Sequence, residues 1–164
     1  HKFVDEALWS RAYENRSLSI GHRQTISQPY IVARMTELLI QRFVGRGLVM
    51  KNVLEIGSGC GYQSAVLAQL SENVLGLERI KPLVRKSRIN LLELRISNVK
   101  IKHADGFQAA DELEECFDGI LCASAPRDIP TELIPLLKKD ANLVIPVGSS
   151  EQTLTVITKK SKKN

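Results

Sequence analysis

The sequence has no long hydrophobic run, and this absence excludes one class of protein. No stretch of its 164 residues approaches the roughly 20 consecutive apolar residues that a membrane-spanning helix needs. No secretory pattern opens the given sequence, in which His1 and Lys2 lead directly into acidic, helix-like residues. We therefore expect no membrane partner. The first residue is not Met, so we expect this chain to be a piece of something longer.

Cysteine and histidine are scarce, with three residues of each, and neither forms a recognisable cluster. The cysteines, Cys60, Cys116 and Cys122, include no CxxC pair, and their odd number and irregular spacing argue against a disulfide framework. The histidines are too scattered along the chain for an obvious metal site. We therefore expect reduced thiols, a cytoplasmic location and no bound metal.

The excess of basic residues is concentrated at one end of the chain. Four of the five net positive charges belong to lysines within the last six residues, which leaves the remainder at only +1. That is too little for a surface that follows a phosphate backbone, so we expect no nucleic-acid partner. The lysine-rich end is typical of a solvated terminus.

Helix-like and strand-like segments alternate along most of the chain. Apolar residues at helical spacing predict a helix from Pro29 to Phe43, after residues 15–28 that have the pattern of a loop. Further helices are expected at 4–14, 62–70, 82–94 and 130–138, and strands at 52–56, 73–78, 98–105, 117–124, 142–147 and 153–159. This order predicts an α/β fold with a doubly wound, mostly parallel sheet and helices on both faces. Only a short Gly-Ser turn precedes the last strand, which should therefore be antiparallel.

A glycine-rich loop lies in the stretch VLEIGSGCGYQSAVLAQL (53–70), between a strand and a helix. Glycines allow a tight turn and the close approach of a ligand, and the start of the helix offers free N–H groups. The third glycine of a dinucleotide fingerprint would stand at Tyr62, and no lysine follows Gly61 as in a phosphate-binding loop of the Walker type. A purely structural turn remains an alternative.

Acidic residues end the next two predicted strands, and they narrow the choice of ligand. Glu78 comes 21 residues after Gly57, and Asp105 ends the third strand. Ligands of doubly wound sheets bind at the edge formed by the carboxyl ends of the strands. Glu78 could therefore accept hydrogen bonds from both hydroxyls of a ribose, and Asp105 could bind an adenine edge. Either acid taken alone could be a turn residue or a surface charge. Together they predict an adenosine-like ligand without a pyrophosphate, and S-adenosylmethionine fits.

Several segments in order resemble the protein-L-isoaspartate (D-aspartate) O-methyltransferases. GHRQTISQPYIVARMTELL is similar to that family's signature segment, and VLEIGSGCGYQ to its glycine motif. LERI, HADGF, FDGILCASAP and LVIPVG resemble its later motifs, and QTISQP is the most specific, because methyltransferases in general lack it. In two places the sequence departs from the family pattern. Asp140-Ala141-Asn142 replaces a Gly-Gly turn, which we expect to survive, and Cys60 stands where a small residue is usual.

The resemblance implies a repair enzyme that methylates the free carboxylate of L-isoaspartyl and D-aspartyl residues in damaged proteins and peptides. It implies one domain, in which residues 1–50 line the substrate site, residues 51–158 form the cofactor core and residues 159–164 form a tail. We also expect a monomer, and family members normally continue beyond both ends of this chain. Carried over by position, the family's catalytic residue is Ser27, and its cofactor residues are Thr25, Glu55, Gly57, Ser58, Gly59, Gly61, Glu78, Asp105 and Gly106.

Three alternatives stay open at this level. Ser27 lies two residues before Pro29, so it could simply cap the following helix. The enzyme could methylate another acceptor, such as RNA or a small molecule, although no basic face or stacking aromatic motif is evident near the site. The chain could also be a module that binds the cofactor without turnover.

Overall fold

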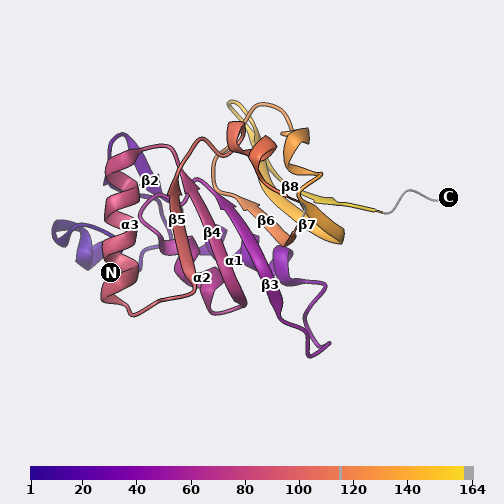
Figure 1. The fold of residues 1–164 in the computed structure, drawn as a ribbon. Helices are drawn as coiled ribbons and strands as arrows, with labels where there is room; N and C mark the ends of the chain where they lie inside the picture. Colours follow the sequence, from indigo (N-terminus) through magenta and orange to yellow (C-terminus); the bar gives the residue numbers. More distant parts are fainter. Residues whose placement is uncertain (115, 161–164) are drawn as a thin grey trace.

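A six-stranded sheet forms the centre of the computed structural model, which describes residues 1–114 and 116–160 (Figure 1). Its strand order is β5-β4-β3-β6-β7-β8. The strands are β3 (Met50–Ile56), β4 (Ser71–Glu78), β5 (Val99–His103), β6 (Phe117–Cys122), β7 (Leu137–Gly148) and β8 (Gln152–Thr158). All neighbours pair in parallel except β7 and β8, which are antiparallel. The predicted fold class and the antiparallel last strand are therefore confirmed.

Three α-helices pack on one face of this sheet, and short 3₁₀ turns cover the other. The helices are α1 (Pro29–Ile40), α2 (Tyr62–Ala68) and α3 (Lys81–Glu93), and the turns are η2 (Gln108–Glu112) and η3 (Thr131–Leu133). Alternate side chains of β3 pack against the layers on the two faces of the sheet. Val53 packs in the same cluster as Leu39 of α1, whereas Leu54 packs in the same cluster as Leu133 of η3. Glu55 follows Val53 by two positions and so faces the helical layer.

The structure corrects three of the predicted elements and the expectation of helices on both faces, because the second face carries only 3₁₀ turns. Residues 4–14 were expected to form a helix, but only a 3₁₀ helix at Glu6–Arg11 is present there. Residues 130–138 were expected to form a helix, but only η3 is helical there and β7 already begins at Leu137. Residues 15–28 were expected to be a loop, but they contain a hairpin of β1 (Leu18–Gly21) and β2 (Gln24–Ile26). Such short strands carry too few alternating residues to be recognised from their pattern.

The N-terminal segment is fixed over the glycine loop by apolar and polar contacts. It begins with the 3₁₀ helix η1 (Glu6–Arg11) and continues into the hairpin. Ile20 of β1 is buried in one cluster with Cys60 and Leu83. Lys86 of α3 donates to Asp5 at 2.6 Å and to the Ile20 carbonyl at 3.4 Å. These contacts bring the QTISQPY segment beside a loop that lies thirty residues later in the sequence.

In the C-terminal half, the predicted turn at Asp140 is present, and Lys159 of the predicted tail contacts the rest of the chain. Asp140 has φ of 61° within β7, so the expected turn survives as a local bend of the strand. Lys159 is not simply solvated, because its ammonium donates to the carbonyls of Pro135 and Leu137 at 2.9 and 2.7 Å. Lys162 and Lys163 lie outside the described residues. Within the described part of the chain, no helix is long and apolar enough to cross a membrane.

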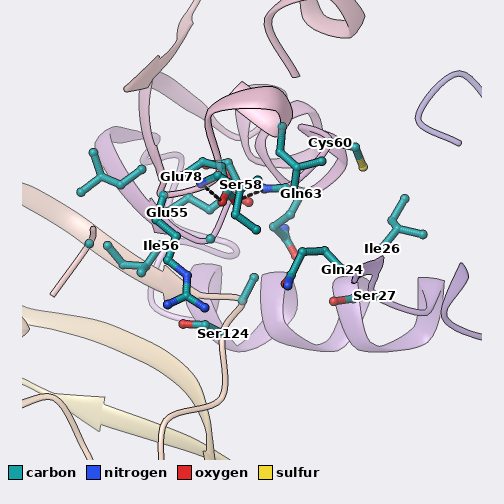
Figure 2. A pocket seen from close by; sticks show the side chains of 18 of the residues that line it. Gln24, Ile26, Ser27, Glu55, Ile56, Ser58, Cys60, Gln63, Glu78 and Ser124 are labelled. Carbon is teal, nitrogen blue, oxygen red and sulfur yellow. Dashed lines mark hydrogen bonds between the residues drawn. The ribbon is translucent and has the colours of Figure 1, made fainter. Parts of the chain in front are cut away.

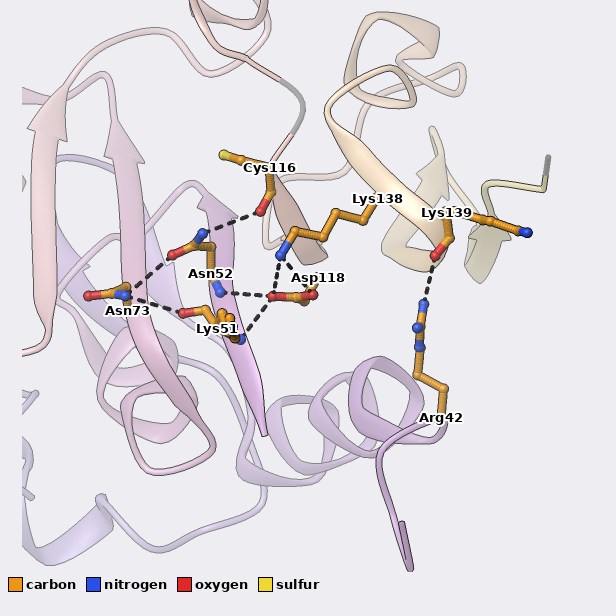
Figure 3. Close-up of polar contacts among 8 residues, drawn as sticks. All are labelled: Arg42, Lys51, Asn52, Asn73, Cys116, Asp118, Lys138 and Lys139. Atoms are coloured by element: carbon orange, nitrogen blue, oxygen red, sulfur yellow. Dashed lines mark hydrogen bonds and ion pairs between the residues drawn. The ribbon is translucent and has the colours of Figure 1, made fainter. Parts of the chain in front are cut away.

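The carboxylate of Asp118 joins three adjacent strands at the edge of the sheet where they begin (Figure 3). It accepts from the backbone N–H groups of Lys51 and Asn52 on β3, at 2.8 and 3.0 Å, and from Lys138 on β7 at 3.1 Å. Partial burial by itself would raise the pKa of Asp118. The Asn52 N–H, Lys138 and the Lys51 N–H outweigh that effect, so the pKa lies below its ordinary value.

We expect Asp118→Asn to lower the free energy of unfolding at pH 7 by about 1–3 kcal/mol, because it removes the charge from the hydrogen bonds with three donors. A depressed pKa contributes stability that is complete above the ordinary Asp pKa and is lost as pH falls through the folded pKa. The gap between variant and wild type should therefore narrow below about pH 4. Urea unfolding at pH 7 and pH 3 measures the difference in free energy of unfolding between variant and wild type. Asp111→Asn, at an exposed position, is the control. A gap that does not change with pH would contradict this role.

Candidate active site

A cavity of about 270 Å³ opens where the parallel strands end, at the low end of the size range of small-molecule sites (Figure 2). Segments from across the chain line it. They are residues 24–27 of the hairpin and its exit, 55–60 of the glycine loop, 77–80 after β4, 104–107 after β5 and 123–126 after β6. The predicted site residues Thr25, Ser27, Glu55, Gly57, Ser58, Gly59, Glu78, Asp105 and Gly106 all line this cavity.

Gly61 is the one predicted site residue that does not line the cavity. It has φ of 90° and is the N-cap of α2. A Cβ at this position would stand 3.2 Å from the Cβ of Ser87 on α3. The glycine therefore allows α2 to begin in close contact with α3, which is a packing role.

The glycine loop is held in place by backbone and side-chain hydrogen bonds. The N–H groups of Gly57 and Ser58 donate to the Leu77 carbonyl at 2.8 and 3.3 Å. Glu78 accepts from the Gly59 N–H through Oε2 at 2.9 Å and from the Ile80 N–H through Oε1 at 2.8 Å. Each carboxylate oxygen has further lone-pair capacity, so Glu78 can still accept from a ligand in the cavity.

Glu55 is fully buried and has one oxygen without a partner. Its Oε2 accepts a short hydrogen bond from the hydroxyl of Ser64, while no described residue donates to Oε1. Burial raises the pKa of Glu55 to about 7, an effect that Ser64 partly offsets and the nearby charge of Glu78 reinforces. The Ser58 hydroxyl likewise has no hydrogen-bond partner among the described residues. Hydrogen bonding from the Ser58 side chain also lowers the pKa of Glu55, so these two neighbouring atoms can be each other's partners.

Asp105 serves the chain as well as the cavity. Its Oδ1 accepts from the N–H of Phe107 at 3.1 Å and of Gln108 at 3.4 Å, and so stabilises the turn into η2. The following Gly106 is required by close packing, because a Cβ there would lie 2.5 Å from Cγ2 of Ile56. Asp105 thus combines the turn role with a position on the cavity wall.

Ser27 does not cap α1, so the capping interpretation is wrong. Gln28 is the N-cap residue and Pro29 begins the helix, with no side-chain cap hydrogen bond. The Asn15 side chain accepts from the Tyr30 N–H at 3.0 Å and satisfies that backbone group instead. No described residue bonds to the Ser27 hydroxyl, which lies at the cavity rim near Gln24 (Figure 2).

Sequence reasoning missed five polar residues of the cavity wall, namely Gln24, Tyr62, Gln63, Arg79 and Ser124. Ser124 follows the end of β6, so the rule that singled out acids at the ends of β4 and β5 would have found it. Gln24 and Gln63 carried no such signal. Their positions depend on how the hairpin and α2 pack against the sheet.

The cavity suits an adenosine-like ligand that carries a positive charge. Three acidic residues, Glu55, Glu78 and Asp105, line it at successive strands, and the glycine loop leaves room for a ligand between them. The described residues contain no cluster of three side chains that could hold a metal ion.

The sequence and structure resemble proteins of one kind. The family model described as Protein-L-isoaspartate(D-aspartate) O-methyltransferase (PCMT) matches residues 1–164. A protein-L-isoaspartate O-methyltransferase of Methylobacillus flagellatus is 55% identical over 157 residues, which are 96% of this chain and 68% of that protein. One from Saccharophagus degradans is 54% identical with the same coverage of both chains.

A solved structure agrees with these relatives. It is a protein-L-isoaspartate O-methyltransferase from Plasmodium falciparum, determined in complex with S-adenosyl-L-homocysteine. It superposes with a TM-score of 0.80 at 30% identity and covers 98% of this chain and 77% of its own. With the matching glycine loop, strand-end acids and QTISQPY segment in place around one cavity, the chain belongs to the protein-L-isoaspartate(D-aspartate) O-methyltransferase family.

Proposed function

We propose that Ser27 orients the substrate carboxylate in this enzyme, which transfers a methyl group from S-adenosylmethionine to L-isoaspartyl and D-aspartyl residues of damaged proteins. One observation supports the role of Ser27 above the others. Its hydroxyl has no partner among the described residues, and it faces the same cavity as the glycine loop and the strand-end acids. A free hydroxyl at that rim can bind a carboxylate that enters from outside.

The cofactor fits the residues that remain available. We assign the ribose hydroxyls to Glu78 and the adenine edge to Asp105, with Gly57, Ser58, Gly59 and Gly106 leaving space for close approach. Thr25 lies two residues before Ser27 in the cavity lining, whereas Glu55 lies beside Ser58 and Glu78 (Figure 2), near the glycine loop where we place the amino acid portion. Gly61 supports this site through its contact with α3.

The main requirement of the reaction is that the protein aligns the substrate carboxylate with the methyl donor. S-adenosylmethionine supplies an electrophilic methyl group on a positively charged sulfur. The substrate carboxylate is already ionised at neutral pH, so no general base is required. Ser27 can hold the carboxylate in line by a hydrogen bond, and such alignment contributes to the rate as effective molarity. The cavity wall excludes water around charges that neutralise each other.

The same assignment divides the chain into functional parts. Residues 1–50 would cover the substrate side, residues 51–158 would hold the cofactor and residues 159–164 would form a tail. The low net positive charge of the chain outside its last six residues supports a peptide substrate over a nucleic acid. Free thiols at Cys60, Cys116 and Cys122 support the proposed cytoplasmic location. The monomeric state stays a prediction.

The substrate assignment is tested with a pair of peptides that differ only in one linkage. We expect the enzyme to methylate an isoaspartyl peptide and to leave its normal aspartyl twin unmodified. The rate of transfer of a labelled methyl group from S-adenosylmethionine to each peptide gives the ratio of the two methylation rates. Equal methylation of both peptides, or of neither, would exclude the repair function.

Ser27→Ala separates alignment from cofactor binding. We expect the affinity for S-adenosylhomocysteine to stay unchanged while kcat/KM for the isoaspartyl peptide falls by roughly 10–100-fold, because the carboxylate loses its orienting donor. Calorimetry and initial rates measure the two quantities. Ser149→Ala, in the exposed turn before β8, is the control. Normal turnover by a variant that merely unfolds earlier would mean that Ser27 is structural.

Glu55→Gln tests the burial of the carboxyl group in the ligand-free protein. Between the ordinary value of 4.5 and the folded pKa of about 7, the folded state binds more protons than the unfolded state, so stability falls as pH rises. The variant lacks this loss, and its stability relative to wild type should grow by roughly 1–3 kcal/mol from pH 4.5 to pH 8.5. Urea unfolding at both pH values measures it, with the exposed Glu112→Gln as control. A constant difference would mean that Glu55 titrates normally.

A further inference from the structure

The charges of the chain are divided between two consecutive segments of opposite sign. Residues 79–103 contain eight lysines and arginines and one acidic residue, whereas residues 104–137 contain eight acidic residues and one arginine. Because the two excesses cancel, the low net charge outside the last six residues does not show that one part of the molecule is strongly basic. That part comprises α3 and β5, at the end of the sheet opposite β8 (Figure 1).

One side of α3 is exposed and carries both basic and apolar side chains. Ile89 and Leu92 are 56% and 76% exposed, although apolar residues three positions apart on a helix ordinarily face the core. Exposed arginines stand beside them on the same side of the helix. With the two basic residues at the entrance to the helix they form what we call the α3 surface, which consists of Arg79, Lys81, Arg85, Arg88, Ile89 and Leu92.

The protein does not neutralise the charges of the α3 surface. In the part of the chain that the structure describes, Lys86 is the only basic residue of segment 79–103 in an ion pair, and it contacts Asp5. Arg88 donates to the Ile101 carbonyl, which occupies its N–H groups without cancelling its charge. Glu93 is the single acidic residue of α3 and comes last in the helix. The α3 surface therefore attracts groups that carry negative charge.

The α3 surface begins beside the cavity. Arg79 and Ile80 line the cavity, and α3 starts at the next residue, Lys81. At a rise of 1.5 Å per residue, Leu92 lies about 16 Å further along the helix, a distance that about five extended residues can span. A peptide whose isoaspartyl residue occupies the cavity can therefore place its neighbouring residues on the α3 surface.

We propose that the α3 surface docks the part of the substrate chain next to the isoaspartyl residue and selects chains in which that part is acidic. This inference rests on the proposed function, because it assumes that the isoaspartyl residue enters the cavity. It adds a class of preferred substrate, namely damaged chains with acidic residues around the reacting carboxylate. A nucleic acid fits the surface less well, because α3 contains no aromatic residue on which bases could stack, whereas Ile89 and Leu92 suit a polypeptide.

Two isoaspartyl peptides of equal length test this preference. One carries glutamates and the other glutamines at the positions on both sides of the isoaspartyl residue. At low ionic strength, kcat/KM of the wild type should be about ten-fold higher for the glutamate peptide, as expected for electrostatic steering. In about 0.5 M sodium chloride the ratio should fall toward one, because salt screens exposed charges.

Charge reversal then identifies the surface responsible. In the double variant Lys81→Glu/Arg85→Glu, kcat/KM for the glutamate peptide should fall to the value for the glutamine peptide or below it, while kcat/KM for the glutamine peptide stays unchanged. The double variant Lys139→Glu/Lys160→Glu is the matched control. It changes the net charge by the same amount at exposed positions at the other end of the sheet, and it should keep the preference.

The possible failures are distinguishable. Equal kcat/KM of the wild type for both peptides at low ionic strength, or an equal loss of preference in the two double variants, would overturn this inference and leave methyl transfer to isoaspartyl residues intact. Folded wild-type protein that methylates neither peptide would overturn the proposed function and this inference with it. Equal rates on both peptides, together with binding to phosphatidylglycerol vesicles that Lys81→Glu/Arg85→Glu abolishes, would assign the α3 surface to anionic lipid instead.

Discussion

The carboxylate of Glu78 accepts hydrogen bonds from the N–H groups of Gly59 and Ile80, and the cavity depends on this pair of contacts. One bond holds the glycine loop after β3, and the other holds the chain as it leaves β4 toward α3. Because the loop is fixed, α2 begins at a defined place, with Gln63 and Ser64 in its first turn. A single buried acid thus sets both the floor of the cavity and the start of the helix that supplies its polar wall.

Asp118 and Glu55, at opposite edges of the sheet, differ in how many hydrogen bonds the protein donates to them. Where the strands begin, Asp118 receives two backbone N–H groups and the ammonium of Lys138, so its charge is satisfied by the protein. Where they end, Glu55 keeps an oxygen without a donor. Satisfied carboxylates stabilise a fold, whereas an unsatisfied one costs stability until a ligand supplies the donor.

Much of the fold could be predicted because it follows local patterns. Strands with two buried faces gave continuous apolar runs, and α1 and α3 gave apolar residues at helical spacing. The errors came where tertiary contacts decide. Residues 130–138 have helical spacing, but the pairing of Leu137 with Phe117 places the last two of them in β7. The hairpin of β1 and β2 is too short to show a pattern, and its order comes from packing over the glycine loop.

For the site, the sequence by itself determined the glycine loop, the acids at the strand ends and the family motif that contains Ser27. These features lie at fixed spacings within or next to single helices and strands. Only the tertiary structure decided what each residue faces. It showed that Asn15, and not Ser27, satisfies the start of α1, that Gly61 packs against α3, and that Gln63 donates a hydrogen bond to Thr36. These relations join segments far apart in the chain, and no local spacing encodes the direction in which a side chain finds its partner.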